Sequence, residues 1–298
     1  MKQKKILSYE RQKSRYGYLF IGMWLIGFIV FFLIPLFTSI RYSFNDVKIE
    51  TGYVKLTPVG FKNYIDLFVS DEEFMPAFTK TLTKVITQTP MICIFSLFIA
   101  IILNQKFRGR TIARAVFFIP VIISGGVVMN IINGDTFLGM IMSGQRGGML
   151  FEANSIYESL VEFGLDSLIV DWIMNMVNSI FKLVWSSGVQ IILFLSGLQS
   201  INPSLYEVGK VEGANAWVSF WKITLPMISP MILVNLMYTI IDNFISYSNE
   251  MFQLIQKTTS NIQFDSAAAM AVINFFVIFV LIAVVYLIIN KHVYYAVD

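Results

Sequence analysis

The sequence predicts an all-α transmembrane protein with six spanning helices and both termini on the cytoplasmic side. Hydrophobic residues make up 56% of the 298 residues and charged residues only 14%. Soluble domains have about 45–50% apolar and about 25% charged residues, so this composition indicates a membrane protein. A span needs about 20 largely apolar residues. Six uncharged windows are near that length or longer: Tyr16–Ile40, Val85–Gln105, Ala115–Gly134, Leu183–Tyr206, Ile223–Ile241 and Ser266–Asn290.

The windows are expected to be helices and not strands of a barrel. A barrel strand alternates polar and apolar residues, and the run "INFFVIFVLIAVVYLII" in the last window has no such alternation. The first window is too long for a signal-peptide core and has no small-residue cleavage site after it. We therefore expect it to be a retained helix.

Basic residues predict the orientation, because cytoplasmic segments carry an excess of Lys and Arg. The tail 1–15 has six basic residues, and the link between the second and third windows has four more: Lys106, Arg108, Arg110 and Arg114. Acidic residues gather in the loops on the opposite side. The expected organisation is a basic cytoplasmic tail (1–15), a transmembrane domain (16–290) and a cytoplasmic C-terminal tail (291–298). Within the domain, the external loops are 41–84, 135–182 and 242–265, and the main cytoplasmic loop is 200–222.

Two external segments are expected to be structured. Residues 58–75 mix aromatic and acidic residues in the manner of a short packed helix. Residues 149–171 place apolar side chains at roughly helical spacing and suggest an amphipathic helix. Both segments either cap the bundle or receive a soluble partner, and the sequence favours neither alternative.

Cysteine and histidine indicate no redox or metal chemistry. The single cysteine, Cys93, lies in an apolar run, so no intramolecular disulfide is possible. The single histidine, His292, has no cluster of metal-ligating residues beside it. The net charge of +3 gives no indication of nucleic-acid binding.

The cytoplasmic loop is expected to begin with a short helix. Asn202 followed by Pro203 is a favourable start, because Asn caps the first turn and Pro needs no N–H there. The helix can extend to about Glu212, and Gly213 then permits a turn.

A second helix is expected after the turn, with Trp217, Phe220 and Trp221 on one face. Such an aromatic face suits the membrane interface. The segment then enters the bilayer at Ile223–Pro226. On physical grounds alone it is either a lever that transmits a push or an ordinary amphipathic re-entry loop.

The spacing of residues in this loop resembles the EAA motif of permease subunits in bacterial ABC importers. Glu207 is followed six residues later by Gly213 and, after nine intervening residues, by "ITLP" at Ile223–Pro226. The wording "INPSLYEVGKVEGANAWVSFWKITLP" is most similar to the branch that imports carbohydrates. "VGFKNYIDLF", "FMPAFTKTL" and "RTIARAVFFIPVIISGGVV" also resemble segments of these permeases. The resemblance implies a six-helix ABC-importer permease bundle, and it favours the lever.

The motif departs from the family pattern at three positions. Val208 and Gly209 replace two alanines, and Glu212 replaces an aspartate. We expect Gly209 to loosen the packing of the first helix, because Gly in a helix costs about 0.5–1 kcal/mol relative to Ala.

The resemblance also implies a set of partners and roles. Glu207 is expected to sit in a cleft of a cytoplasmic ATPase subunit, with Gly213 forming the turn behind it. The complex would contain a second homologous permease, two ATPase subunits and an external substrate-binding protein. This chain has no G-x-x-x-x-G-K-[ST] phosphate loop. ATP and Mg are therefore expected only in the partner ATPase subunits, and this chain is expected to bind no cofactor and to be no enzyme.

Uncharged polar residues in the spanning windows are candidates for the translocation path, because they are costly when they face lipid. The candidates are Asn130, Asn133, Gln190, Asn235, Tyr238, Asp242, Asn243 and Asn274. The alternative role is hydrogen bonding between helices. The row Asn235, Tyr238 and Asp242 favours the path, and Pro226 and Pro230 are expected to kink the same helix.

We therefore expect a permease subunit for a sugar, in particular an oligosaccharide, in a bacterial cytoplasmic membrane. One alternative is a permease for another solute, such as a polyol phosphate or an acidic sugar. The central windows contain no Arg or Lys, which argues against an anionic substrate. A more distant alternative is an ion-coupled transporter or channel, which would place ionisable residues at the midplane.

Overall fold

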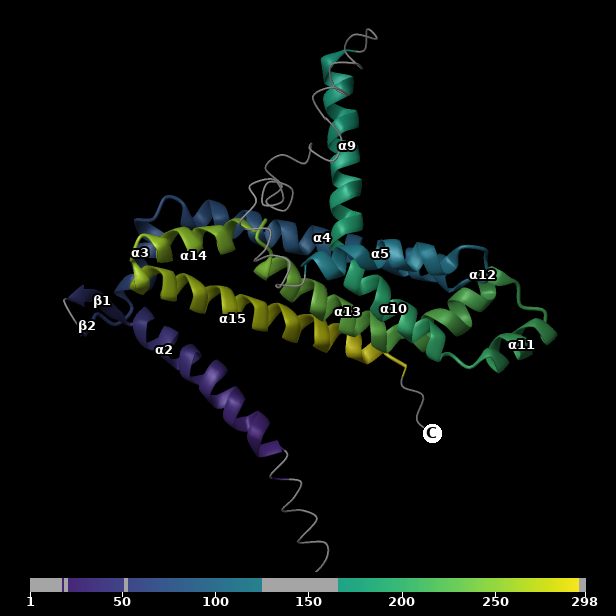
Figure 1. Cartoon of the computed structure of the whole chain (residues 1–298), viewed down its shortest axis with the longest axis horizontal. Coiled ribbons are helices and arrows are strands. Elements are labelled where there is room, and N and C mark those ends of the chain that lie inside the picture. The colour runs from purple at the N-terminus through teal and green to yellow at the C-terminus, as the bar shows by residue number, and fades with distance from the viewer. Residues whose placement is uncertain (1–17, 19–20, 51–52, 125–165, 295–298) are drawn as a thin grey trace, which may run out of the picture. The chain divides into compact units, whose positions relative to one another are not determined.

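The computed structural model describes residues 18, 21–50, 53–124 and 166–294 (Figure 1). It divides into two compact units, Met1–Met75 with Leu254–Phe275 and Pro76–Gln253 with Phe276–Asp298. Within the described residues, five helical stretches are long and apolar enough to cross a membrane: Ile21–Ser43, Phe74–Asn104, Leu168–Ser186, Ala216–Ser260 and Phe264–His292. The expected helical membrane protein is confirmed.

The first unit begins with a spanning helix that leads into a β-hairpin. Its elements are the π-helical turn η1 (Ile29–Leu33), α2 (Ile34–Ser43), β1 (Asn45–Glu50), β2 (Tyr53–Pro58) and α3 (Lys62–Val69). The strands pair antiparallel with Val47 opposite Leu56. The hairpin was not predicted, whereas α3 confirms the short helix expected in 58–75.

Asn63 fastens these elements together. Its side-chain amide is buried and donates to the carbonyls of Ser43 and Asn45, each at 3.0 Å. The hydroxyl of the next residue, Tyr64, donates to Ser43 Oγ at 2.7 Å. Asn63 and Tyr64 on α3 therefore hold the end of α2 next to the start of β1.

The second unit contains most of the remaining helices. They are α4 (Phe74–Asn104), α5 (Arg110–Ser124), α9 (Ser167–Ser186), α10 (Gly188–Ser200), α11 (Pro203–Val211), α12 (Ala216–Ser219), the π-helical turn η2 (Phe220–Thr224), α13 (Leu225–Ile245), α14 (Glu250–Ser260), α15 (Phe264–Ile289) and the 3₁₀ turn η3 (Asn290–His292). Three of these, α4, α14 and α15, have residues in both units.

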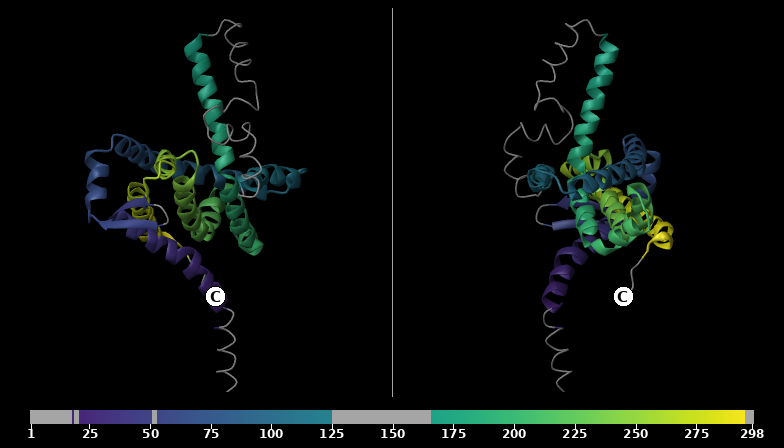
Figure 2. Two further views of the ribbon diagram at one scale, coloured as in Figure 1. Left: turned by 60° about the vertical axis from the view of Figure 1, so that its left-hand side comes forward. Right: turned by 90° about the vertical axis from the view of Figure 1, so that its right-hand side faces the viewer.

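The core of the second unit is formed where α4, α10 and α13 pack together. Its buried side chains include Ala100, Ile191, Phe194 and Ile228. Figures 1 and 2 show α9 projecting away from this group of helices, with its C-terminal end beside them. The core therefore holds the helices on either side of the loop at 200–222.

The fourth window is divided, which differs from the single span expected at Leu183–Tyr206. Its first residues belong to α9, the helix breaks at Ser187, and α10 has only 13 residues. Ser187 Oγ donates to the Val184 carbonyl at 2.9 Å. Such local side-chain bonds compete with a continuing helix, and Gly188 adds backbone freedom. Of the predicted external helix at 149–171, most residues lie outside the described part.

Each π-helical turn ends two residues before a proline. Pro35 is the second residue of α2 after η1, and Pro226 is the second residue of α13 after η2. Leu225 N–H bonds to the Phe220 carbonyl, five residues back. Proline has no N–H and its ring clashes with the carbonyl four residues earlier, so the wider turn relieves this crowding. At Pro226 the expected irregularity is therefore a π-turn.

Candidate coupling and translocation site

Local hydrogen bonds set both ends of α11. Asn202 Oδ1 accepts from Ser204 N at 3.0 Å, as expected for a cap. At the other end Gly213 has φ +82°, and its N–H bonds to the Lys210 carbonyl. The next N–H, of Ala214, bonds to the Gly209 carbonyl at 2.8 Å. These two bonds form a Schellman motif, which requires a left-handed residue at this position. The predicted turn at Gly213 is confirmed.

The chain then re-enters the bundle through α12 and η2. Asn215 Oδ1 accepts from Val218 N at 2.9 Å and caps α12. Trp217 and Trp221 meet edge to face at 5.5 Å, and both rings are exposed. The expected aromatic face is confirmed, and it continues without a break into α13.

Two contacts join α11 to the π-turn η2. The hydroxyls of Tyr206 and Thr224 hydrogen-bond at 3.0 Å across 18 residues of sequence. Gly209 is buried against Ile223, and a Cβ added to Gly209 would lie 3.0 Å from Ile223 Cδ1. We call these four residues the α11–η2 joint. It explains the spacing of the motif, because Ile223 and Thr224 open "ITLP" and meet the helix that carries Glu207.

The expectation that Gly209 loosens the packing of α11 was therefore wrong. The glycine lets the helix backbone approach Ile223 more closely than an alanine would. Its intrinsic cost to the helix stands, but the site it occupies is a close contact and not a gap.

The remaining residues of the predicted coupling set face solvent. Glu207, Val208 and Glu212 are all exposed, with 56% of Val208 accessible. They give α11 an outer surface with two carboxylates and one apolar side chain. This surface and the α11–η2 joint lie on different faces of the same helix, so α11 can bind a partner without releasing η2.

The candidate path residues fall into different environments. Gln190 donates to Thr239 Oγ1 at 3.2 Å, and Asn243 donates to Thr89 Oγ1 at 3.4 Å. Asn235 is fully buried, and neither of its amide atoms has a partner within the described residues.

Tyr238 and Asp242 lie on α13 and are half-buried. Asn274 on α15 is buried, and its Oδ1 has no partner in the described part of the chain. Asn130 and Asn133 lie outside the described residues. The structure thus brings Gln190, Asn235 and Asn243 to the interior between helices, and Tyr238 and Asp242 to a partly open face.

Sequence reasoning missed the hydroxyl partners of this site. Thr239 accepts from Gln190 and lies 3.7 Å from the sulfur of Cys93. Tyr206 and Thr224 were passed over because each reads as an ordinary helix residue. Their pairing depends on how α11 folds back, which no local pattern encodes.

The comparisons with known proteins agree with this geometry. Residues 77–296 match the family model described as binding-protein-dependent transport system inner membrane component. The probable ABC transporter permease protein YesP of Bacillus subtilis is 32% identical over 80% of this chain and 73% of its own length. The multiple sugar-binding transport system permease protein MsmF of Streptococcus mutans is 33% identical over 73% of this chain and 70% of its own length.

A further relative is the arabinooligosaccharides transport system permease protein AraP of Bacillus subtilis. It is 30% identical over 78% of this chain and 70% of its own length. Among solved structures, a bacterial ABC transporter that imports the acidic polysaccharide alginate superposes with a TM-score of 0.64. The superposition covers 95% of this chain and 97% of that chain at 21% identity, so it supports the fold alone.

The fold and the loop define a multi-pass membrane subunit of a transport system. The chain belongs to the family of inner membrane components of binding-protein-dependent transport systems, and it is an ABC transporter permease.

Proposed function

We propose that this permease forms the translocation path of an ATP-driven sugar importer, and that its substrate is an oligosaccharide. The support is the similarity to permeases named for multiple sugars and for arabinooligosaccharides. A second homologous permease, two cytoplasmic ATPase subunits with ATP and Mg, and an external binding protein complete the proposed assembly. Both termini and the loop at 200–222 lie on the cytoplasmic side.

The observation that carries the proposal is the connection from α11 through η2 to α13. Glu207 is exposed on α11, which suits docking into an ATPase subunit. The α11–η2 joint ties the same helix to the start of α13. ATP-driven movement of a docked α11 would therefore displace η2 and α13 together.

The test replaces Glu207 with alanine in the intact complex. We expect Glu207→Ala to abolish sugar uptake by cells while the complex is still recovered from the membrane. Lys291→Ala, an exposed change outside this loop, is the control and should transport normally. Uptake by Glu207→Ala at the control rate would refute the coupling role.

For the path we propose the row Asn235, Tyr238 and Asp242 on α13. The Asn235 amide is fully buried and has no partner among the described residues. Because such an amide destabilises a fold by about 1–3 kcal/mol, contact with the transported substrate would account for its presence. Asn235→Leu should lower uptake while it leaves the thermal stability of the complex unchanged or higher. Unchanged uptake in Asn235→Leu would remove this residue from the path.

Two measurements address the partners and the substrate. Purification of the tagged permease should recover an ATPase subunit, and its absence would favour an ATP-independent transporter. Calorimetry of the associated binding protein against neutral and acidic oligosaccharides should give binding to neutral sugars. If the binding protein binds acidic sugars alone, the substrate is an anionic sugar and not a neutral one.

A further inference from the structure

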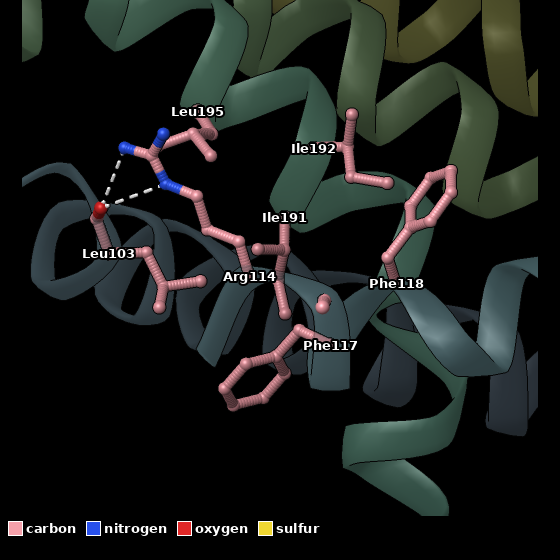
Figure 3. A pocket seen from close by; sticks show the side chains of 8 residues that line it. Leu103, Arg114, Phe117, Phe118, Ile191, Ile192 and Leu195 are labelled. Atoms are coloured by element: carbon pink, nitrogen blue, oxygen red, sulfur yellow. Dashed lines mark hydrogen bonds between the residues drawn. The ribbon is translucent and has the colours of Figure 1, made fainter. Parts of the chain in front are cut away.

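A pocket of about 270 Å³ lies in the second unit, where α4 ends, α5 begins and α10 passes (Figure 3). Seven of its eight lining side chains are apolar, and the eighth is Arg114. The apolar residues are Leu103, Ala115, Phe117, Phe118, Ile191, Ile192 and Leu195. An apolar cavity with one cation at its edge matches a ligand that has an apolar chain and an anionic group.

Arg114 is held in a fixed position. Its Nε and Nη2 donate to the Leu103 carbonyl at 3.3 and 2.9 Å, as the dashed lines in Figure 3 show. These bonds satisfy a carbonyl of the last turn of α4. A guanidinium has five N–H donors in a planar fork, so donors remain for an anion. Arg114 makes no ion pair with the residues that the structure describes.

The surroundings of the pocket are positively charged. Lys106 and Arg108 are exposed on the short link between α4 and α5, and Arg110 is exposed at the first position of α5. No acidic residue occurs between Val85 and Gly134. Basic pockets between spanning helices on the cytoplasmic side are where anionic headgroups bind. The charge pattern therefore selects an anionic ligand over a zwitterionic one.

The depth of the pocket fits one leaflet of the bilayer. Phe118 lies four residues after Arg114, which corresponds to about 6 Å along the helix axis. Half of a hydrocarbon core of about 30 Å is about 15 Å. A chain that starts beside Arg114 and runs past Phe118 therefore stays within the leaflet next to the basic link.

We propose that this pocket binds an anionic phospholipid of the cytoplasmic leaflet. The phosphate bonds to the free N–H groups of Arg114, and an acyl chain lies against Phe117, Phe118 and Leu195. The proposal rests on the membrane orientation given under the proposed function. It does not depend on the sugar or on the coupling role of Glu207, so each can fail while the other stands.

The test is native mass spectrometry of the delipidated intact complex with added lipids. Phosphatidylglycerol should bind about tenfold or more tightly than phosphatidylcholine with the same chains, because both offer a phosphate to Arg114 but the choline cation of phosphatidylcholine is repelled by the guanidinium. Arg114→Gln should abolish this preference. Ala115→Phe leaves Arg114 intact and fills the pocket, so it should remove the bound lipid. Lys222→Gln removes an exposed basic residue elsewhere and should change nothing.

Further arms separate the other occupants. Inorganic phosphate added to the complex with bound phosphatidylglycerol should not displace the lipid. Displacement would show that the pocket binds a free anion and not a lipid. A photocrosslinker at Phe118 should label lipid, and labelling of the second permease would show a protein interface instead. Equal binding of the two lipids, or unchanged binding in a folded Ala115→Phe complex, would overturn the proposal. Thermal midpoints of each variant confirm that the complex is folded.

Discussion

The two ends of α13 are held in different ways. At the Ile245 end, Asn243 donates to Thr89 on α4, and its carbonyl accepts from Asn249, whose Oδ1 accepts in turn from Thr81 on α4 at 3.0 Å. At the Leu225 end, Ile228 is buried in the core, and the α11–η2 joint and one bond from Tyr294 N to Ser229 Oγ at 2.9 Å add polar contacts. Directional polar bonds that reach α4 hold the first end, whereas apolar packing against α10 and bonds to short segments hold the second. We infer that a push on α11 reaches the Leu225 end of α13 first, because the α11–η2 joint contacts that end.

The largest effect is expected at the Ile245 end of α13. Asn249 is fully buried, caps α14 by accepting from Met251 N, and donates to the Asn243 carbonyl. Asn249→Ala removes the cap and leaves the Thr81 hydroxyl without its acceptor. The expected cost is about 2–4 kcal/mol. Thermal unfolding of the purified complex, followed by size-exclusion chromatography, should show a midpoint lower by roughly 5–15 °C.

The matched control at this end is Gln253→Ala, which removes a bond from an exposed amide to the Tyr247 carbonyl. It should shift the midpoint by little. Similar midpoints for Asn249→Ala and the control would mean that the polar side chains do not anchor α13.

How much of this contrast the sequence predicts depends on the range of the interactions. Asn202 and Gly213 were predicted because capping and a left-handed turn involve neighbours in sequence. The spans follow from hydropathy, which is also local. The bond between Thr81 and Asn249 joins residues 168 apart, and either residue alone reads as a surface polar residue. The polar bonds at the Ile245 end of α13 could therefore not be predicted from the sequence.

The same limit explains the two errors of interpretation. Gly209 was read by its helix propensity, whereas its contact with Ile223 exists only after α11 has folded back. The window Leu183–Tyr206 was interpreted as one span because it has no charged residue. The absence of charge gives no information on the helix break at Ser187. Composition predicts which segments enter the membrane, and packing decides where each helix stops.

The second largest effect is expected from a substitution at Gly213, in the turn between α11 and α12. Gly213 has φ +82°, a conformation that costs a β-branched residue roughly 1–2 kcal/mol. Gly213→Val should therefore open the turn and lower sugar uptake about 5- to 30-fold. The thermal midpoint should hardly move, because Gly213 is exposed and outside the core.

Gly213→Asn is the matched control for this prediction. Asparagine tolerates the left-handed region, so the turn and most of the uptake should be retained. If valine and asparagine at this position transport equally well, the shape of the turn does not matter for coupling.

A smaller effect is expected from the hydroxyl pair of the joint. Tyr206→Phe removes the bond to Thr224 and keeps the ring, at a cost of about 1 kcal/mol. Transport per ATP hydrolysed should fall about fivefold in proteoliposomes, while ATP hydrolysis continues. The same substitution at Tyr247, an exposed residue near the Ile245 end of α13, should leave this ratio unchanged. If Tyr206→Phe transports as much per ATP hydrolysed as wild type, the bond between Tyr206 and Thr224 does not transmit the movement of α11 to α13.

The smallest effect, and the most specific, is expected at Gly209. Alanine improves helix propensity by up to about 1 kcal/mol, but its Cβ would lie only 3.0 Å from Ile223 Cδ1. Gly209→Ala should therefore stabilise α11 slightly while it shifts the helix away from η2, and transport per ATP should fall about twofold. Ile223→Val removes the crowded Cδ1 atom and should restore the ratio in the double variant.

This cycle distinguishes contact from helix stability, since the two explanations predict opposite results. If propensity dominates, Gly209→Ala alone transports as well as wild type, and Ile223→Val gives no further change. If the contact dominates, only the double variant recovers, with a coupling energy of roughly 0.5–1 kcal/mol between the two sites. Recovery would show that α11 moves α13 through the close contact between Gly209 and Ile223, at the end of the helix that the α11–η2 joint holds.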